Sequence, residues 1–258
     1  MPKKPQRIVL KFGSGILASA RGVSLDAKQF RRLAKEVAAL VKTGHECCIV
    51  SSGAVAAGLG VLGLKARPES LAERQACAAI GQSRLMQMYS SEFARHGLHV
   101  AQLLLTHGDL DSRQRHANAR STLEHLFARR SVVPIINEND SVAVEELRFG
   151  DNDRLSAEVA MLADADLLIL LTSVDGLLDE RGKTVPVVVD IDAAAKLARE
   201  EKGRFSVGGM TSKLQAVKLA VDAGIATYVV SGRKAGRIAD AAAGRRVGTR
   251  FVAKGERL

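Results

Sequence analysis

The 258-residue chain has 47% hydrophobic and 26% charged residues and a formal net charge of +10. Its length allows one large α/β domain or two small ones, and no apolar run approaches the roughly 18 residues of a membrane span. Its three cysteines and six histidines show no metal-binding spacing, so we expect no structural metal site. The amino-terminal segment lacks a secretory h-region, which predicts a cytoplasmic protein.

The positive charge favours an anionic partner, either nucleic acid or a phosphate-rich small molecule. With no Trp and only two Tyr, the chain has little from which to build a base-stacking platform. We therefore expect no nucleic-acid partner. An Arg-rich solvated surface without any partner is the alternative explanation of the charge.

Short apolar runs alternate with helical patterns along the chain. This order is typical of βαβ crossovers around a mainly parallel sheet buried on both faces. Because no linker or repeat interrupts it, we predict a single α/β domain over residues 1–258. The runs expected as strands are Ile8–Leu10, Cys47–Val50, Val100–Leu105, Val132–Ile136, Leu167–Leu171 and Thr227–Val230.

Two helices and one hairpin have clear sequence signals. Asp26 can cap a helix that ends before Gly44, and a second helix is expected from about Glu69 to Arg95. Gly81 inside the second helix either marks a break or lets another backbone or a ligand approach closely. Residues 174–190 place a polar turn between apolar arms, which predicts a hairpin or flap.

Ligands of open parallel sheets bind beyond the carboxyl ends of the strands, and two strand ends offer anion-binding groups. The first strand ends in Lys11, and Gly13-Ser14-Gly15 follows, a turn whose N–H groups can surround an anion. The spacing is not that of a Walker A loop. The second strand runs into Ser52 and Gly53, where a hydroxyl and a helix start can hold a carboxylate or phosphate. A structural lysine in the first case, and an N-cap Ser51 or Ser52 in the second, are the alternatives.

Amides and carboxylates fill two segments on either side of residue 145. The fourth strand ends in Asn137-Glu138-Asn139-Asp140, and Gly150-Asp151-Asn152-Asp153 introduces the next helix. Such clusters suit binding of an ammonium group or orientation of a nucleophile. Further on, Gly208-Gly209-Met210-Thr211-Ser212-Lys213 starts a helix and can hold phosphate, unless it is only a flexible turn. Two lysines on glycine turns together favour a phosphotransferase.

Six segments, in order, resemble the glutamate 5-kinase family of the amino-acid kinase superfamily. They are VLKFGSGIL, IVSSGAVAAG, IINENDSVA, FGDNDRLSA, LLTSVDGL and VGGMTSK, and the resemblance covers Ile8 to about Phe251. It implies a three-layer αβα sandwich with a mainly parallel central sheet. It also implies ATP- and Mg²⁺-dependent phosphorylation of the side-chain carboxylate of L-glutamate to L-glutamyl 5-phosphate, the first step of proline biosynthesis.

The resemblance assigns roles residue by residue. Lys11 and Lys213 would stabilise the phosphoryl group in transfer, and Asp153 would orient both lysines. The residues expected to bind glutamate are Ser52, Gly53, Asn137, Asp140, Asp151 and Asn152. Those expected to bind ATP are Lys11, Gly13, Ser14, Thr172, Ser173, Val207, Gly208, Gly209, Met210, Thr211, Ser212 and Lys213. Mg²⁺ would be held by nucleotide phosphates and water, so no protein ligand is expected.

The resemblance also has departures and further implications. The family commonly has Thr-Asp where this chain has Thr172-Ser173, and Gly-Thr-Gly-Gly where it has Ser206-Val207-Gly208-Gly209. Many bacterial members continue into a PUA domain, whereas this sequence stops at Leu258, as a short member or as a chain given without that domain. A homodimer or homotetramer, feedback inhibition by proline and channelling to glutamyl phosphate reductase are implied. A sibling kinase, a sensor without catalysis and an RNA-binding module are the rival interpretations.

Overall fold

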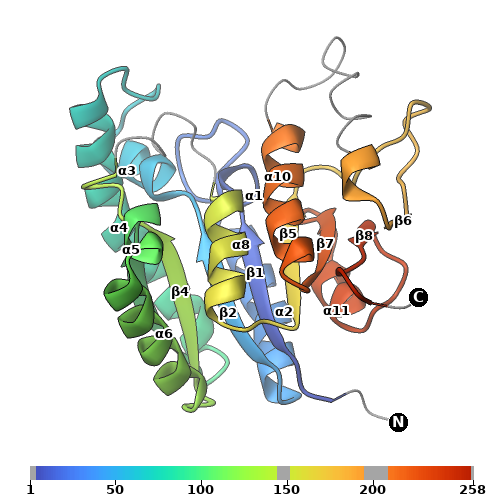
Figure 1. Ribbon diagram of the computed structural model, residues 1–258. Helices are drawn as coiled ribbons and strands as arrows, with labels where there is room; N and C mark the ends of the chain where they lie inside the picture. Colours follow the sequence, from blue (N-terminus) through green and yellow to red (C-terminus); the bar gives the residue numbers. More distant parts are fainter. Residues whose placement is uncertain (1–3, 144–151, 195–208, 257–258) are drawn as a thin grey trace.

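A computed structural model describes residues 4–143, 152–194 and 209–256. Its centre is an eight-stranded sheet with the order β3-β4-β2-β1-β5-β7-β8-β6 (Figure 1). The six predicted strands are confirmed, and two short strands that we did not predict lie at one edge of the sheet. The strands are β1 (Arg7–Phe12), β2 (Glu46–Ser51), β3 (His99–Leu105), β4 (Val132–Glu138), β5 (Leu167–Thr172), β6 (Val187–Val188), β7 (Ala226–Ser231) and β8 (Thr249–Phe251).

The sheet is mainly parallel, as predicted. All pairings from β3 to β7 are parallel, and β8 runs antiparallel to β7. Because parallel strands end at the same edge, the carboxyl ends of β4, β2, β1, β5 and β7 lie side by side. The polar segments that follow these strands are therefore brought to one edge of the sheet.

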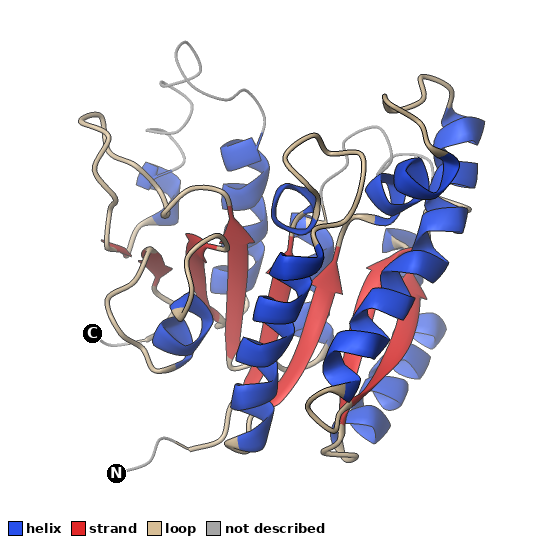
Figure 2. Cartoon of the chain, turned by 180° about the vertical axis from the view of Figure 1, so that it is seen from behind, coloured by secondary structure: helices blue, strands red, loops and turns tan. Residues whose placement is uncertain are grey.

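Helices cover both faces of the sheet, which confirms the three-layer αβα fold (Figures 1 and 2). One layer holds α2 (Ala27–Lys42), α4 (Leu71–Ala94) and α11 (Arg237–Ala242), and the other holds α6 (Arg113–Phe127), α8 (Asp153–Leu162) and α10 (Gly209–Asp222). The shorter helices α1 (Ser14–Leu17), α3 (Ala54–Leu62) and α5 (His107–Asp111) follow strand ends. No helix of the described segments is both long and apolar enough to cross a membrane.

Alternation along β1 decides where its lysine lies. Successive side chains of a strand point to opposite faces, and Leu10 and Phe12 pack in the core with α2 and α4. Val9 packs in the other core, with α8 and α10. Lys11 therefore belongs to the face that α8 and α10 cover. The sequence pattern of one strand thus directs its single lysine toward two helix starts.

Helix α2 begins as predicted, and α4 settles the question of Gly81. The Asp26 carboxylate accepts hydrogen bonds from the backbone N–H groups of Lys28 and Gln29, which caps α2. Helix α4 runs without a break through Gly81. A Cβ atom there would lie 1.8 Å from the carbonyl oxygen of Ala54 in α3. The glycine therefore marks a close approach of two backbones, the second of our two alternatives.

The segment 174–190 forms the predicted hairpin turn. Leu178 and Thr184 form an antiparallel bridge, and the Asp179 carboxylate accepts hydrogen bonds from the N–H groups of Arg181 and Lys183. An Asp side chain that bonds N–H groups two and four residues on stabilises such a turn. The far arm continues into β6, which pairs with β8.

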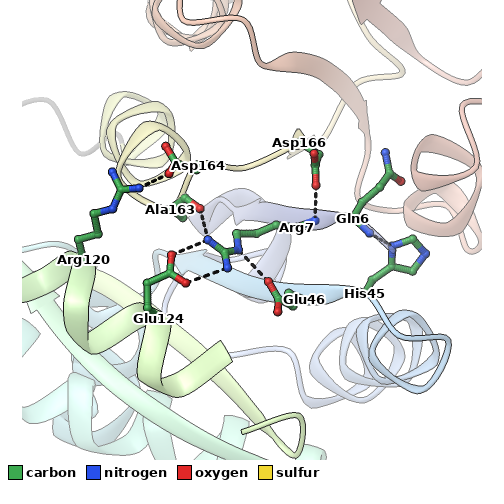
Figure 3. Close-up of polar contacts among 9 residues, drawn as sticks. All are labelled: Gln6, Arg7, His45, Glu46, Arg120, Glu124, Ala163, Asp164 and Asp166. Carbon is green, nitrogen blue, oxygen red and sulfur yellow. Dashed lines mark hydrogen bonds and ion pairs between the residues drawn. The ribbon is translucent and has the colours of Figure 1, made fainter. Parts of the chain in front are cut away.

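Arg7 ties together several elements at the amino ends of the strands (Figure 3). Its guanidinium donates to Glu46 on β2, to both carboxylate oxygens of Glu124 on α6 and to the carbonyl oxygen of Ala163 after α8. The guanidinium carbon lies 4.4 Å from the ring centre of Phe127, a cation–π contact. The amino end of the sheet thus has a cation whose donors are well matched by acceptors.

Candidate active site

Two lysines and one aspartate meet at the carboxyl edge of the sheet. Lys11 Nζ lies 2.5 Å from Asp153 Oδ1, and Lys213 Nζ lies 2.8 Å from Asp153 Oδ2. The lysines come from β1 and α10, and the aspartate is the first residue of α8. The structure therefore brings together the three residues predicted as catalytic, although the chain separates Lys11 from Lys213 by about two hundred residues.

This cluster is buried and carries an excess of positive charge. The side chains of Lys11 and Asp153 are 5% and 1% exposed, and that of Lys213 is 16% exposed. A carboxylate at a helix start is stabilised by the helix dipole and the free N–H groups. One carboxylate nevertheless faces two ammonium groups. In a site that excludes water, such an arrangement favours binding of a further anion.

The absence of a side chain at Gly13 leaves room for the Lys11 ammonium. A Cβ atom built at Gly13 would lie 3.3 Å from Lys11 Nζ, a tight contact that would displace the lysine or its ligand. Ser14 is exposed beside it. Both residues were predicted to contact ATP, and they do lie next to the predicted catalytic lysine; their contacts with nucleotide stay a prediction.

A cavity of about 510 Å³ opens at the carboxyl ends of β1, β2 and β4. It is lined by five of the six residues predicted to bind glutamate, which come from three separate parts of the chain: Ser52, Gly53, Asn137, Asp140 and Asn152. Gly53 has φ of +102° at the N-cap of α3, a left-handed conformation that favours glycine. The sixth residue, Asp151, lies outside the described residues.

A hydrogen-bonded chain of amides forms the inner wall of this cavity. The Asn152 amide donates to the carbonyl oxygen of Ser51 at 2.5 Å and to Asn137 Oδ1 at 2.8 Å. The Asn137 amide in turn donates to Gln82 Oε1 at 2.8 Å. Asn137 and Asn152 are both buried. The network joins the ends of β2 and β4 to α4 and α8, and it fixes the rotamers of the two asparagines.

Neither serine at the end of β2 is an N-cap, so that alternative was wrong. Gly53 is the N-cap of α3, and it has no side chain with which to cap the helix. The Ser51 hydroxyl donates to the Ser52 carbonyl and lies 2.8 Å from the Tyr89 hydroxyl. Burial raises the pKa of Tyr89, although the hydrogen bond with Ser51 opposes this shift. Ser51 thus anchors the strand end, and Ser52 is left to line the cavity.

The residues predicted to bind nucleotide lie farther along the same edge. Thr172 ends β5 and is buried, and its carbonyl oxygen accepts a hydrogen bond from Gly232 N–H after β7. Ser173 is exposed, and Met210, Thr211 and Ser212 are partly buried in the first turn of α10. Gly209 is the first residue of α10. Val207 and Gly208 lie outside the described residues.

Sequence reasoning missed four basic residues and two polar residues around the cavity. The basic side chains are exposed and line the cavity's rim: Arg21, Lys65, Arg67 and Arg233. They lie in loops without any recognisable motif. Gln82 and Tyr89 occupy helix α4, where the sequence shows only an ordinary polar and an ordinary aromatic position. Their contacts with Asn137 and Ser51 span 55 and 38 residues of chain, so no local pattern indicates them.

A second ionic contact joins α5 to α8. His107 Nδ1 is 2.5 Å from Glu158 Oε2, and Arg154 also donates to Glu158 at 2.8 Å. The hydrogen bond with Glu158 raises the pKa of His107, with Glu138 adding to the shift and burial opposing it. Burial alone would raise the pKa of Glu158, but the bonds from His107 and Arg154 outweigh it and lower that pKa.

Two solved structures share this fold. The UMP kinase of Bacillus anthracis superposes with a TM-score of 0.66 at 16% identity and is covered over 97% of its chain, with 96% of this chain matched. Carbamate kinase from Giardia lamblia bound to AMP-PNP gives a TM-score of 0.68 at 18% identity, with 96% of this chain and 99% of that chain covered. At such low identity the likeness concerns the fold alone.

Sequence similarity shows the family of this chain as well as its fold. The model of the amino acid kinase family matches residues 6–231. A glutamate 5-kinase from Citrifermentans bemidjiense is 44% identical over 263 residues, which cover 99% of this chain and 70% of that protein. A glutamate 5-kinase from Thermus thermophilus is 46% identical over 255 residues, with 96% of this chain and 68% of that protein covered. The chain therefore belongs to the amino acid kinase family and, within it, to the glutamate 5-kinases.

Proposed function

We propose that this chain transfers the γ-phosphoryl group of ATP to the side-chain carboxylate of L-glutamate, which yields ADP and L-glutamyl 5-phosphate, the first step of proline biosynthesis. The observation that carries the proposal is the pair of lysines, Lys11 and Lys213, which both contact the carboxylate of Asp153, at 2.5 and 2.8 Å. Family membership supports the choice of acceptor.

The charge of this cluster suits phosphoryl transfer. Negative charge in the transition state spreads over the transferring, attacking and leaving oxygens, so catalysis is largely positioning and cationic stabilisation. Two ammonium groups fixed by one shared carboxylate supply that charge without a large reorganisation. Asp153 is placed to keep the like-charged Lys11 and Lys213 side by side before the substrates arrive.

The order of strands separates the acceptor from the donor. The cavity lined by Ser52, Asn137 and Asn152 lies at the ends of β2 and β4. The residues expected to bind nucleotide follow β5, as Thr172 does, or begin α10. Strand β1 lies between β2 and β5, so Lys11 stands between the two groups. This arrangement supports attack by an acceptor carboxylate from one side and departure of ADP to the other.

The acceptor cavity also suits the charges of glutamate. Asp140 supplies a carboxylate and Asn152 an amide for an ammonium group, while Ser52 supplies a hydroxyl and Gly53 a helix start for a carboxylate. Arg21 and Arg233 at the rim add positive charge that attracts a dicarboxylate. A uridine nucleotide would need a base-binding surface, and no aromatic residue of the described segments lines this cavity.

The Mg²⁺ ion that accompanies ATP finds no protein cage in the described ranges, because no group of three His, Cys, Asp or Glu side chains converges there. Phosphate and water oxygens are the ligands that Mg²⁺ prefers when it is bound with a nucleotide.

Other features of the family remain proposals for this chain. A homodimer or homotetramer, channelling to glutamyl phosphate reductase and a cytoplasmic location stay predictions. Proline shares with glutamate a carboxylate next to a cationic nitrogen, so feedback inhibition would act at or beside the acceptor cavity. Competition between proline and glutamate in a kinetic assay tests that point.

One assay tests the proposed function. ADP release is measured with glutamate, aspartate, N-acetylglutamate and UMP in turn, with hydroxylamine present to trap any acyl phosphate as a hydroxamate. Glutamate is expected to give ADP and hydroxamate in equal amounts, and the other acceptors far less of either. ADP release driven by UMP without hydroxamate from glutamate would refute the proposal. Binding of oligonucleotides without ATP turnover would favour an RNA-binding module instead.

A further inference from the structure

The side-chain amides of Asn152, Asn137 and Gln82 form a chain of hydrogen bonds behind the acceptor cavity. The carbonyl oxygen of Ser51, at one end, determines which atom of each amide donates and which accepts. The carbonyl oxygen of Ser51 can only accept a hydrogen bond, so the group that faces it at 2.5 Å must be the amide nitrogen of Asn152. The same nitrogen donates its other hydrogen to Asn137 Oδ1. Asn137 must then present its own nitrogen to Gln82, which accepts through Oε1. Each amide thereby fixes the orientation of the next.

This direction determines which atom of Asn152 remains for a ligand. Both hydrogens of the amide nitrogen are used by Ser51 and Asn137. The side chain caps no backbone N–H of α8. Among the residues that the structure describes, Oδ1 is therefore the Asn152 atom left to bind a ligand in the cavity that this residue lines. An oxygen in that position accepts a hydrogen bond but cannot donate one. It therefore suits an ammonium group and repels a carboxylate.

Gln82 lies at the far end of this chain of hydrogen-bonded amides and does not line the cavity. Its position on α4 is fixed by the neighbouring Gly81, where α4 touches the backbone of Ala54 and Gly58 in α3. The amide nitrogen of Gln82 is buried and has no hydrogen-bond partner within the described part of the chain. Only its oxygen is used, for Asn137. The contact that Gln82 makes is therefore that of a hydrogen-bond acceptor aimed at one asparagine.

We infer that Gln82 is a positioning residue for the acceptor: by accepting from Asn137 it holds both asparagine amides in the orientation that offers Asn152 Oδ1 to the α-ammonium group of glutamate. This inference rests on the proposed function. If the acceptor at position 82 is lost, Asn137 can rotate its amide, and its nitrogen then opposes the nitrogen of Asn152. Two donors facing each other destabilise the arrangement and disturb the atom that holds the ammonium.

The test compares two substitutions of nearly equal size. Gln82→Glu keeps an acceptor oxygen, and Gln82→Met removes it while it retains the length of the side chain. We expect Gln82→Met to raise the KM for glutamate about ten-fold, with the KM for ATP and kcat within about two-fold. Gln82→Glu should keep the glutamate KM within about three-fold of wild type. Gln87→Met is the matched control, because Gln87 is exposed on the same helix and should change nothing.

Glutarate separates positioning from general damage to the fold. It has both carboxylates of glutamate and no ammonium group, so its inhibition constant against glutamate should shift less than about two-fold in Gln82→Met. Damage to the fold would weaken glutamate and glutarate together, and melting temperatures of all variants check the fold independently. An unchanged glutamate KM in Gln82→Met, an equal loss in Gln82→Glu, or equal weakening of glutarate would overturn the inference.

The assay of the wild-type protein distinguishes failure of the proposed function from failure of the role assigned to Gln82. Hydroxamate formation from glutamate by the wild type is measured first, and its absence would refute the proposed function. An active wild type whose Gln82 variants behave like Gln87→Met would refute only the role of Gln82.

Discussion

The two ends of strand β1 hold cations in opposite ways. At the amino end, the Arg7 guanidinium donates to Glu46 at 2.8 Å and to Glu124 at 2.6 Å, so one positive charge faces two negative ones. At the carboxyl end, Lys11 and Lys213 share Asp153, so in this cluster of three described side chains two positive charges face one negative charge. The first group is rich in anions, and the second is rich in cations.

This difference separates stability from function along a single strand. A cation such as Arg7, with two carboxylates around it, contributes to folding by joining β1, β2 and α6, and it has no charge left for a ligand. Two buried ammonium groups around one carboxylate oppose folding, since like charges in a poorly solvated site repel each other. Such an arrangement is retained where a ligand adds negative charge. Four substitutions test this separation of stability from function.

The largest effect is expected at the carboxyl end. Lys213→Ala removes one of the two charges that would stabilise the transferring phosphoryl group, so kcat should fall at least about 100-fold, as the hydroxamate assay measures it. The melting temperature should stay the same or rise, because Lys213→Ala relieves the repulsion between the two ammonium groups while Lys11 still pairs with Asp153. Lys218→Ala, on the same helix with exposed partners Asp192 and Asp222, is the control. Near-wild-type turnover would remove Lys213 from the mechanism.

The amino end should show the reverse pattern. Arg7→Met leaves Glu46 and Glu124 without their shared cation, and it should lower the free energy of unfolding by about 2 kcal/mol, a value reduced because both carboxylates are partly exposed. Urea denaturation measures this loss, and kcat of the folded enzyme should not change. Arg120→Met, which removes an exposed pair with Asp164, should cost less than about 0.5 kcal/mol. A drop in kcat of Arg7→Met under folding conditions would contradict this separation.

The acceptor cavity offers an intermediate effect. Asn152→Ala removes the amide that lines the cavity and joins Ser51 to Asn137. The KM for glutamate should rise about ten-fold while the KM for ATP stays within about two-fold. Initial rates at varied glutamate and varied ATP measure both constants, and Asn118→Ala on the outer side of α6, where Asn118 bonds Gln114, is the control. A raised KM for ATP with an unchanged KM for glutamate would mean that the two sites are exchanged.

The smallest effect concerns the pair His107 and Glu158, a balanced contact near the carboxyl edge. Folding raises the pKa of His107, so the stability that this residue contributes is complete below its ordinary pKa of 6.5. That stability is lost as the pH rises through the pKa of His107 in the folded protein. Folding lowers the pKa of Glu158, so the stability that Glu158 contributes is present above its ordinary pKa of 4.5 and is lost as the pH falls through its pKa in the folded protein. The pair therefore stabilises most between these two ordinary values.

Thermal unfolding of His107→Gln at several pH values measures this window. The difference from wild type should be largest at about pH 5.5, amount to less than about 1 kcal/mol, and shrink toward about pH 9. His125→Gln, on an exposed turn of α6, serves as the control. A difference that grows steadily with pH would show that the sign is wrong.

The sequence predicted the main body of the sheet because each of its inner strands is a continuous apolar run. Strands β6 and β8 escaped prediction because they are two and three residues long, and a run of that length has no periodicity. Gly81 shows a different limit. The sequence marks it as unusual for a helix interior, but only the approach of Ala54 in α3 distinguishes a contact from a break.

In the candidate site, too, the sequence indicated some residues and not others. Lys11 and Lys213 were recognisable because glycine turns surround them in the sequence, whereas the role of Asp153 was assigned by the resemblance to the family. Gln82 was not, since its side-chain hydrogen bond reaches a residue 55 positions away, and a glutamine on a helix is ordinary. The basic rim residues Lys65 and Arg67 were missed for the same reason. Short motifs indicate which residues can bind a ligand, whereas the orientation of a side chain depends on contacts between distant segments.

The length of strand β1 fixes the distance between its two cations. Arg7, Val9 and Lys11 occupy alternate positions and face the same helical layer, and the four steps between the two cations span about 13 Å. Deletion or insertion of a single residue between them would turn one cation into the opposite layer, where α2 and α4 pack apolar side chains against β1. Surface loops generally tolerate insertions and deletions, but this five-residue interval does not.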